Sequence, residues 1–264
     1  MKKAILTLIF SCAIMSSAMA WGILGHRSIA EVAERHLTPA AKANIEKYTK
    51  GTPLASYAIW MDEVRKYDPH HEKATRGWHA SVVDEQCKTS QAIRNKYRKG
   101  RDTVTGLLEL EKMLENRENL SDSVVMFAIK SIVHMVADMH CPAHLRYSDY
   151  RNDGKFRIKF YGSDTTLHKI WDTSILTHEH KGWSYEKYAT KLDTASKGEI
   201  KRISKGWVED WLEESGRIIR PHIYKVRAGD ELGDEFMGWA YPLAESQARK
   251  SGYRLAKYLN KVFR

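Results

Sequence analysis

The chain has 264 residues, of which 43 are Lys or Arg and 33 are Asp or Glu, so its formal net charge is +10. Three cysteines are too few for a disulfide-built scaffold, and their spacing excludes a cysteine-based zinc ribbon. The positive charge indicates either a polyanionic partner, such as nucleic acid, anionic lipid or a phosphorylated substrate, or ordinary charge for solubility.

Residues 1–20 are typical of a secretory signal peptide. Two lysines precede a mostly apolar run over residues 4–15, and an Ala-Met-Ala cleavage site ends at Ala20. The apolar run is too short to span a membrane, and the residues before Cys12 make a poor lipid-anchor site. We therefore expect an exported protein, periplasmic or secreted, with no membrane anchor and a mature chain of residues 21–264.

The first half of the mature chain predicts short helices separated by turns. Thr38 is a good N-cap with Pro39 at the first helical position, and residues 51–53 form a turn. Residues 67–76 are polar, contain two histidines and indicate a loop. Helices are expected at 26–36, 38–49, 54–66, 89–98 and 103–117.

The second half is also rich in helical patterns. Residues 156–161 (FRIKFY) alternate as a strand does, and we expect them to pair in a small hairpin. Helices are expected at 166–176, 184–193, 197–216 and 231–262. Since no repeat or linker divides the chain, the predicted class is all-α: a single mainly helical domain with a small β-hairpin.

The run from residue 121 to 144 carries the densest set of metal-ligand side chains. His134 and Asp138 are four residues apart in a helical pattern, so both side chains lie on one helix face. Because a buried charge is costly unless it is paired or coordinated, this density favours a metal site over isolated core histidines. His140 cannot share the face of Asp138, so we expect it to be a supporting or structural histidine.

The end of this helix supplies another candidate ligand. Cys141-Pro142 ends the helix, because proline cannot continue the hydrogen-bond ladder and disfavours α geometry in the residue before it. His144 therefore sits on a turn and can point back at the helix end. His168 and Asp172, further along, repeat the four-residue helical spacing.

Five stretches occur in a fixed order along the chain: WGILGHR, WMDEVR, WH, HxxxDxHxPxH and TLHKIWDT. Together they resemble the secreted zinc-dependent nucleases of the S1/P1 type, whose wider superfamily includes zinc-dependent bacterial phospholipase C. The resemblance runs from Trp21 nearly to the end, and residues 251–260 (SGYRLAKYLN) look like the family's last helix. It implies a phospholipase C/P1 nuclease-like fold with three zinc ions in a cleft, and a nuclease domain over 21–264.

Residue by residue, the resemblance implies three zinc sites. One zinc would be held by Asp62, His79, His134 and Asp138. A partner zinc would be held by His26, Asp138 and the freed amine and carbonyl of Trp21. The third zinc would be held by His144, His168 and Asp172. Imidazole and carboxylate suit zinc, and three or four protein ligands leave positions open for water and substrate.

The resemblance also implies the chemistry. The expected reaction is hydrolysis of single-stranded DNA and RNA to 5′-nucleotides, with 3′-nucleotidase activity, by attack of a zinc-bound hydroxide. Asp138 would bridge the paired zincs, and Asp62 would orient or deprotonate the water in addition to binding zinc.

Aromatic side chains beside the ligand positions could stack on exposed bases. Tyr147, Tyr150 and Phe156 are the candidates for substrate binding, whereas Trp60 and Trp78 are expected in the core. The basic residues of 146–159, Arg151 among them, either contact phosphates or form a solvated face.

Three positions depart from the family pattern. The residue after His79, often aromatic in the family, is Ala80, and the usual HQPLH reads HCPAH over 140–144. A common Gly-Gly-Asn is replaced by residues 151–154. The metal ligands are kept, so hydrolysis is the firmer expectation and substrate preference is left open.

Two other functions remain open. A zinc-dependent phospholipase C would carry Glu at the position of Asp172, so the ligand pattern favours a nuclease. The other is a non-catalytic protein that binds zinc or polyanions on the same scaffold.

In an oxidising compartment Cys87 and Cys141 could form a disulfide. We expect a monomer.

Overall fold

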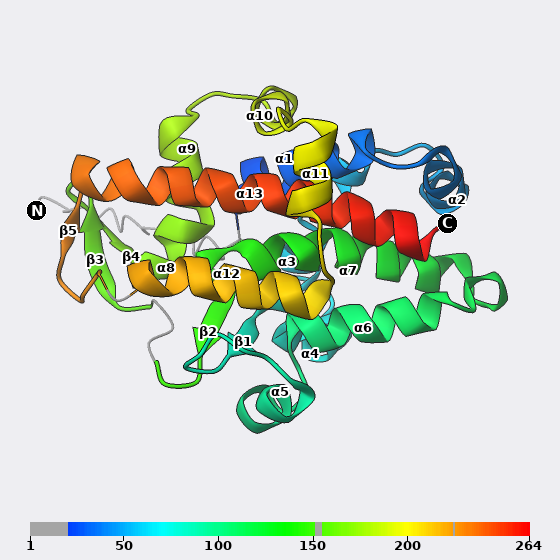
Figure 1. Ribbon diagram of the computed structural model, residues 1–264, viewed down its shortest axis with the longest axis horizontal. Coiled ribbons are helices and arrows are strands. Elements are labelled where there is room, and N and C mark those ends of the chain that lie inside the picture. The colour runs from blue at the N-terminus through cyan, green and yellow to red at the C-terminus, as the bar shows by residue number, and fades with distance from the viewer. Residues whose placement is uncertain (1–20, 151–154, 224) are drawn as a thin grey trace, which may run out of the picture.

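A long buried helix, α7 (Asp122–His140), runs through the middle of the fold in the computed structural model (Figure 1). The structure describes residues 21–150, 155–223 and 225–264, so the expected signal peptide lies outside the described residues. Val125, Ile132 and Val136 are buried on α7. The helix ends at His140, before Cys141-Pro142, as the sequence predicts.

Among the described residues, α7 is also the helix that is long and apolar enough to cross a membrane. However, 72% of its most apolar window is buried inside the protein. A helix that is apolar on all sides and covered by protein is a core helix, so packing accounts for its composition.

Several helices pack on α7. α13 (Asp234–Val262) packs on both α7 and α1 (Gly22–Arg35), and α6 (Thr103–Leu114) also packs on α7. Gly252 permits the close approach of α13 to α1, because a Cβ there would lie 2.7 Å from Val32 Cγ1. This packing holds α1 beside α7, and these two helices carry His26 and Asp138.

The remaining helical elements connect these four, and all of them except α12 are shorter. The α-helices are α2 (Pro39–Thr49), α3 (Trp60–Val64), α4 (Pro69–Thr75), α5 (Gln91–Arg98), α8 (Leu167–Lys169), α9 (Ile175–Glu179), α10 (Tyr185–Leu192), α11 (Lys197–Ile203) and α12 (Val208–Ile223). The 3₁₀ turns are η1 (Leu54–Ser56), η2 (Arg76–His79), η3 (Arg117–Asn119) and η4 (Pro142–His144), and η5 (Ile170–Ser174) is a π-helical turn.

Two short strands bring distant ligand segments together. β1 (Ser81–Val83) pairs in parallel with β2 (Leu145–Tyr147), with Ser81 opposite Leu145. β1 follows η2 and β2 follows η4, so the pairing places His79 and His144 at neighbouring strand ends. The sequence did not predict this pair, because each strand has only three residues.

The expected hairpin is confirmed. β3 (Arg157–Phe160) pairs antiparallel with β4 (Ser163–Thr166), and β5 (Glu231–Leu232) adds a parallel strand at the other edge of β3. The helix expected from residue 231 therefore begins later, with α13 at Asp234.

Three further boundary predictions were wrong. The single helix expected over 54–66 is the 3₁₀ turn η1 followed, after a turn, by the short helix α3. Residues 67–76 were expected to form a loop, but α4 forms because the Asp68 side chain accepts the backbone N–H groups of His70 and His71 and Pro69 occupies the first turn. The single helix expected over 197–216 is two helices, α11 and α12. They are separated by a turn in which Gly206 has φ +81°. The predicted class, mainly helical with a small hairpin, is confirmed.

Candidate metal centre

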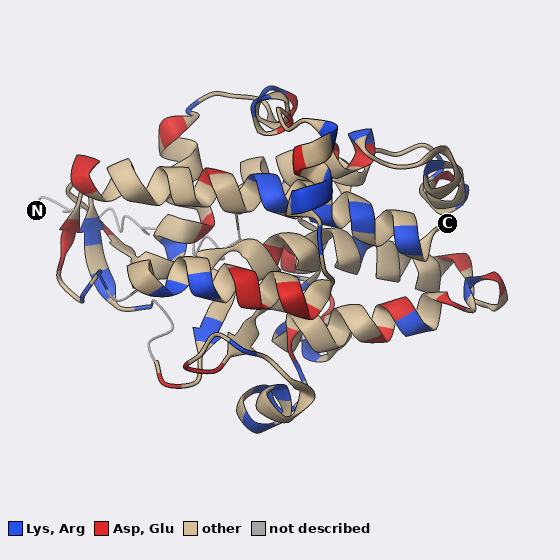
Figure 2. Ribbon diagram, in the orientation of Figure 1, with Lys and Arg blue, Asp and Glu red and all other residues tan. Residues whose placement is uncertain are grey.

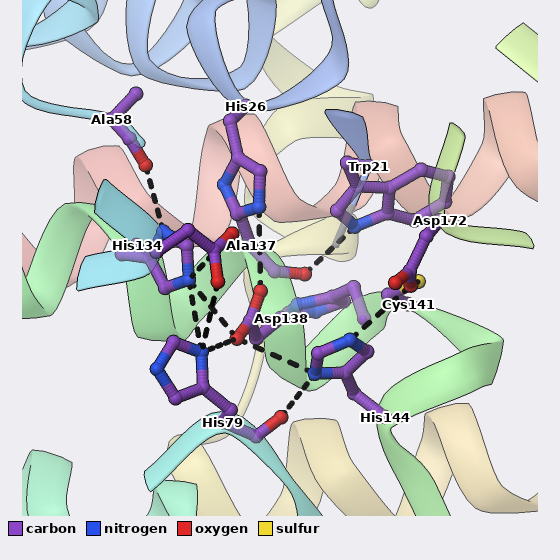
Figure 3. Close-up of polar contacts among 12 residues, drawn as sticks. Trp21, His26, Ala58, His79, His134, Ala137, Asp138, Cys141, His144 and Asp172 are labelled. Atoms are coloured by element: carbon purple, nitrogen blue, oxygen red, sulfur yellow. Dashed lines mark hydrogen bonds and ion pairs between the residues drawn. The ribbon is translucent and has the colours of Figure 1, made fainter. Parts of the chain in front are cut away.

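Eight of the predicted ligand side chains meet in the interior of the protein. They come from segments far apart in the chain and converge on the C-terminal half of α7 (Figure 3). All except His168 are buried residues, and the His168 side chain is 15% exposed. The ligand-type atoms form three groups, each with its atoms within 4.8 Å of one another: His26, His134 and Asp138; Asp62, His79 and His134; and His144, His168 and Asp172.

Asp138 lies between the groups. Its Oδ2 is 3.0 Å from His79 Nδ1 and 3.2 Å from His134 Nε2, and its Oδ1 is 3.4 Å from His26 Nε2. Oδ2 is also 3.4 Å from a nitrogen of His144, which belongs to the third group. One carboxylate therefore faces imidazoles from α1, η2, η4 and its own helix.

His134 is oriented by the backbone. Its Nδ1 lies 2.8 Å from the carbonyl oxygen of Ala58, so Nδ1 carries the proton and donates it. Nε2 therefore faces the carboxylates of Asp62 and Asp138, at 3.7 and 3.2 Å. Such a hydrogen bond from the far ring nitrogen is common in metal-binding histidines.

The third group is built around Asp172, which lies in the π-helical turn η5. Asp172 Oδ1 is 3.2 Å from His144 Nε2, and Oδ2 is 3.1 Å from His168 Nε2. His144 Nδ1 is hydrogen-bonded to the carbonyl oxygen of His79, so the strand pairing that brings η2 to η4 also fixes this ring. The π turn interrupts the expected helix without separating the His168/Asp172 pair.

Trp21 is buried at the start of α1, and its indole N–H donates to the carbonyl oxygen of Ala137 at 2.8 Å, one residue before Asp138. Its backbone is left-handed, with φ +54°. Gly25 gives the indole room, because a Cβ there would lie 2.7 Å from Trp21 Cβ. The WGILGH stretch thus fixes residue 21 next to the metal-ligand cluster.

Burial and neighbouring charges shift the pKa values of the cluster in opposite directions. Burial alone would raise the pKa of Asp138, but His134 and His144 beside it hold that pKa well below its usual range. Burial would lower the pKa of His144, yet Asp138 and Asp172 raise it well above its usual value. The pKa of His134 is raised in the same way, against the effect of burial, by Asp138 and Asp62.

Two histidines of the cluster behave differently. Burial lowers the pKa of His26, and the neighbouring His134 lowers it further. Burial also lowers the pKa of His79, although its hydrogen bond to Asp138 works in the opposite direction. These two rings are therefore neutral near pH 7, which is the form that binds a metal.

Several buried polar atoms of the cluster have no hydrogen-bond partner among the described residues. They are His26 Nε2, Asp62 Oδ2, His79 Nε2, Asp138 Oδ1, His144 Nε2 and Asp172 Oδ2. Buried polar groups are normally satisfied, and these are the lone-pair atoms that would coordinate a cation. The donor set of imidazoles and carboxylates suits zinc.

Two residues to which the sequence analysis gave no such role contact the ligands. Arg65 donates to Asp62 Oδ1 from the next helical turn, and the i, i+3 spacing was the available signal. The Cys141 thiol lies 3.6 Å from Asp172 Oδ1. His140 has the structural role expected of it: Nδ1 donates to Val136 O at 2.8 Å, and Nε2 accepts from the buried Arg254 at 3.0 Å.

Two predictions about side chains need correction. Tyr147 was expected to bind substrate, but its ring is buried and its hydroxyl donates to Gly216 O at 2.8 Å, so it offers no face to a base. Cys87 and Cys141 do not form the disulfide considered above. Both thiols are free, because Cys87 packs against Gly216 of α12 while Cys141 faces Asp172.

The other aromatic candidates remain predictions. Tyr150 and Phe156 are half-buried against the core, and Arg151 lies outside the described residues. Trp60 and Trp78 pack against the core, as expected. A Cβ on Gly106 would lie 2.7 Å from the Trp78 ring, which shows how tightly that ring is held.

Comparison with known proteins supports the same interpretation. The sequence profile described as S1/P1 Nuclease matches residues 21–264. Endonuclease 3 of Arabidopsis thaliana is 22% identical, over 95% of this chain and 91% of its own length. Nuclease P1 of Penicillium citrinum is 24% identical, over 92% of this chain and 97% of its own. Nuclease S1 of Aspergillus oryzae is 22% identical, over 92% of this chain and 91% of its own.

Proposed function

The chain belongs to the S1/P1 nuclease family, and on that premise we propose that it is a zinc-dependent endonuclease of single-stranded DNA and RNA. The proposed products are 5′-nucleotides, and the proposed second activity is 3′-nucleotidase. The proposal rests on the cluster around Asp138 of buried imidazole and carboxylate atoms that have no hydrogen-bond partner among the described residues.

The proposed ligands are the nine residues predicted from the sequence. Asp62, His79, His134 and Asp138 would hold one zinc ion. His26, Asp138 and the backbone of Trp21 would hold a second. His144, His168 and Asp172 would hold a third. The distances from Asp138 to imidazoles of more than one group support a shared, bridging carboxylate.

Zinc bound here would acidify a coordinated water and withdraw charge from phosphate oxygens. The residues of the chain then have separate tasks. Asp62, held by Arg65, keeps Oδ2 unpartnered among the described residues and can accept a proton from an attacking water. Because His168 is the most exposed side chain of the cluster, the scissile phosphate is expected to approach from the side of His168 and His144.

Export and N-terminal processing belong to the same proposal. The profile match begins at Trp21, the residue that follows the predicted cleavage site. We propose that the signal peptide is removed, that residues 21–264 form the nuclease domain, and that the mature protein is a monomer without a membrane anchor. Cleavage would free the Trp21 amine beside the cluster.

Hydrolysis assays test the proposal directly. Protein starting at Trp21 is incubated with single-stranded DNA, single-stranded RNA and phosphatidylcholine vesicles, with zinc and with a chelator. The expected result is release of 5′-nucleotides that stops on chelation and returns with zinc. Release of lipid head groups without nucleotides would identify a phospholipase, and bound zinc without turnover would identify a binding protein. Either result would overturn the proposal.

A further inference from the structure

A basic groove lies next to the metal centre and is not part of it. It has a volume of about 790 Å³ and lies between α4, η2 and the C-terminal end of α5. Its charged lining is Glu72, Lys73, Arg76, Arg98, Lys99 and Arg101. Five cationic side chains and one carboxylate give the groove an excess of four positive charges.

The single carboxylate does not neutralise the groove. Glu72 is paired with Arg76 of the same helix. Among the described residues, Lys73, Lys99 and Arg101 form no ion pair, and all three are exposed. An anion in the groove would therefore meet three cations that have no partner within the described protein.

Helix electrostatics do not account for the whole cluster. Lys96 and Arg98 lie in the last turn of α5, where cations complement the helix dipole, and this helix carries no acidic residue (Figure 2). Lys73 lies in the last turn of α4, where the same account applies, but α4 is a separate helix and Arg101 lies in the turn between α5 and α6. Their convergence on one groove needs a different explanation, and a polyanionic ligand supplies one.

Hydrogen bonds connect the groove to residues 77–80, the segment that contains the proposed ligand His79. Arg98 Nη2 donates to Gly77 O at 3.0 Å. Thr103 donates its hydroxyl to Trp78 O at 2.6 Å and its backbone N–H to Ala80 O at 3.2 Å. These carbonyls flank His79, so the wall of the groove and a metal ligand belong to one rigid segment.

An exposed aromatic ring indicates which polyanion fits. Tyr97 lines the groove and is 43% exposed. A ring of this kind can stack on the face of a base, which a single strand exposes and a duplex hides in its own stack. A lipid surface would make no use of a recessed, strongly cationic groove with one ring.

We propose that this groove binds the phosphate backbone of a single-stranded polynucleotide and leads it into the metal centre. The inference rests on the proposed nuclease function and extends it, because it distinguishes long substrates from short ones. A strand that occupies both sites gains the contacts of Lys73, Lys99 and Arg101. A dinucleoside monophosphate, which fills only the metal centre, gains none of them.

The test compares two triple variants that lose the same charge. One replaces Lys73, Lys99 and Arg101 by Gln. The matched control replaces Lys42, Lys47 and Lys50 by Gln on α2, which lies well away from α5 in Figure 1. The zinc-loaded proteins are assayed for kcat/KM on a long single-stranded DNA and on a dinucleoside monophosphate, over a range of salt concentrations.

Each phosphate contact to a single strand contributes about 0.7 to the slope of log K against log salt, so the groove variant should lose about 2 from that slope. Between about 50 and 200 mM salt, its deficit on the long substrate should shrink ~15-fold. Cleavage of the dinucleoside monophosphate should stay within about twofold of wild type.

Two outcomes would overturn the inference. One is a groove variant that behaves like the α2 control on long DNA. The other is an equal loss on both substrates, which would place the effect in the metal centre. In either case, a wild-type protein that still cleaves the dinucleoside monophosphate would leave the proposed nuclease function standing.

Discussion

Binding of metal should release protons from this protein, and His144 is where the effect should be clearest. Its Nδ1 is hydrogen-bonded to the carbonyl oxygen of His79, so any further proton must sit on Nε2, 3.2 Å from Asp172 Oδ1. Against the effect of burial, Asp138 and Asp172 raise the pKa of His144 well above its usual value. In the chelated protein this ring is therefore charged at pH 7, and a metal must displace its proton.

The sign and size of the pH dependence follow from these groups. Below the raised pKa of His144, one proton is displaced per metal bound, so apparent affinity falls tenfold, or about 1.4 kcal/mol, for each pH unit. Above that pKa the dependence disappears. His134, whose pKa is also raised, adds to the release, whereas His26 and His79 have lowered pKa values and add none near pH 7.

Full loading near neutral pH should therefore release at least the His144 proton, and His134 and the Trp21 amine add to the release. Calorimetric titration of zinc into chelator-stripped protein, in two buffers of different ionisation enthalpy, measures the number of protons released. A competition assay with a coloured chelator measures the affinity across the pH range. Release close to zero with zinc bound, or an affinity that does not change between about pH 5.5 and 7, would refute the electrostatic argument.

Three further predictions follow from the same geometry. Replacing Asp138 by Asn should lower both zinc affinity and kcat/KM by more than the ~100-fold that loss of a supporting hydrogen bond costs, and near wild-type turnover would exclude a bridging role. A mature protein with an extra Met before Trp21 should lose zinc and activity, as elemental analysis and a nuclease assay would show; full zinc content would argue against the amine as a ligand. Replacing the buried Arg254 by Met should lower the free energy of unfolding by about 3 kcal/mol in a urea titration, since His140, Ile203 and Glu214 lose their partner; an unchanged midpoint would contradict that role.

The sequence predicted which imidazoles and carboxylates meet in the core, because part of the pattern is local. His134 and Asp138 are bound to the same helix face by helical spacing, and His168 and Asp172 keep their contact even through a π turn. The order of the motifs then identified His26, Asp62 and His79 through the family resemblance. What no local pattern contained was the parallel pairing of β1 with β2, which sets His79 beside His144.

The direction in which a side chain points was harder to predict than its position along the chain relative to the candidate ligands. Tyr147 lies three residues from His144, which suggested a substrate contact, but β2 turns its ring into the protein toward α12. Cys87 and Cys141 were each close in sequence to a ligand, yet they face different elements. Their positions along the chain place these residues near candidate ligands, but only the tertiary packing determines which elements their side chains contact.

The metal centre is also part of the core, and this constrains how the protein can work. Asp62, Asp138 and Asp172 are buried carboxylates from three separate segments, and such charges are tolerated only when cations or hydrogen bonds offset them. Without metal, protons on His134 and His144 provide part of that offset. Metal bound by the proposed ligands would replace those protons with larger charges, held by residues of α1, α3, α7 and η5. The proposed ions would therefore join elements of the fold as well as activate water. The departures from the family pattern leave the proposed ligand residues unchanged, and this includes the departure at 140–144, where the Cys141 thiol contacts Asp172 Oδ1 at 3.6 Å.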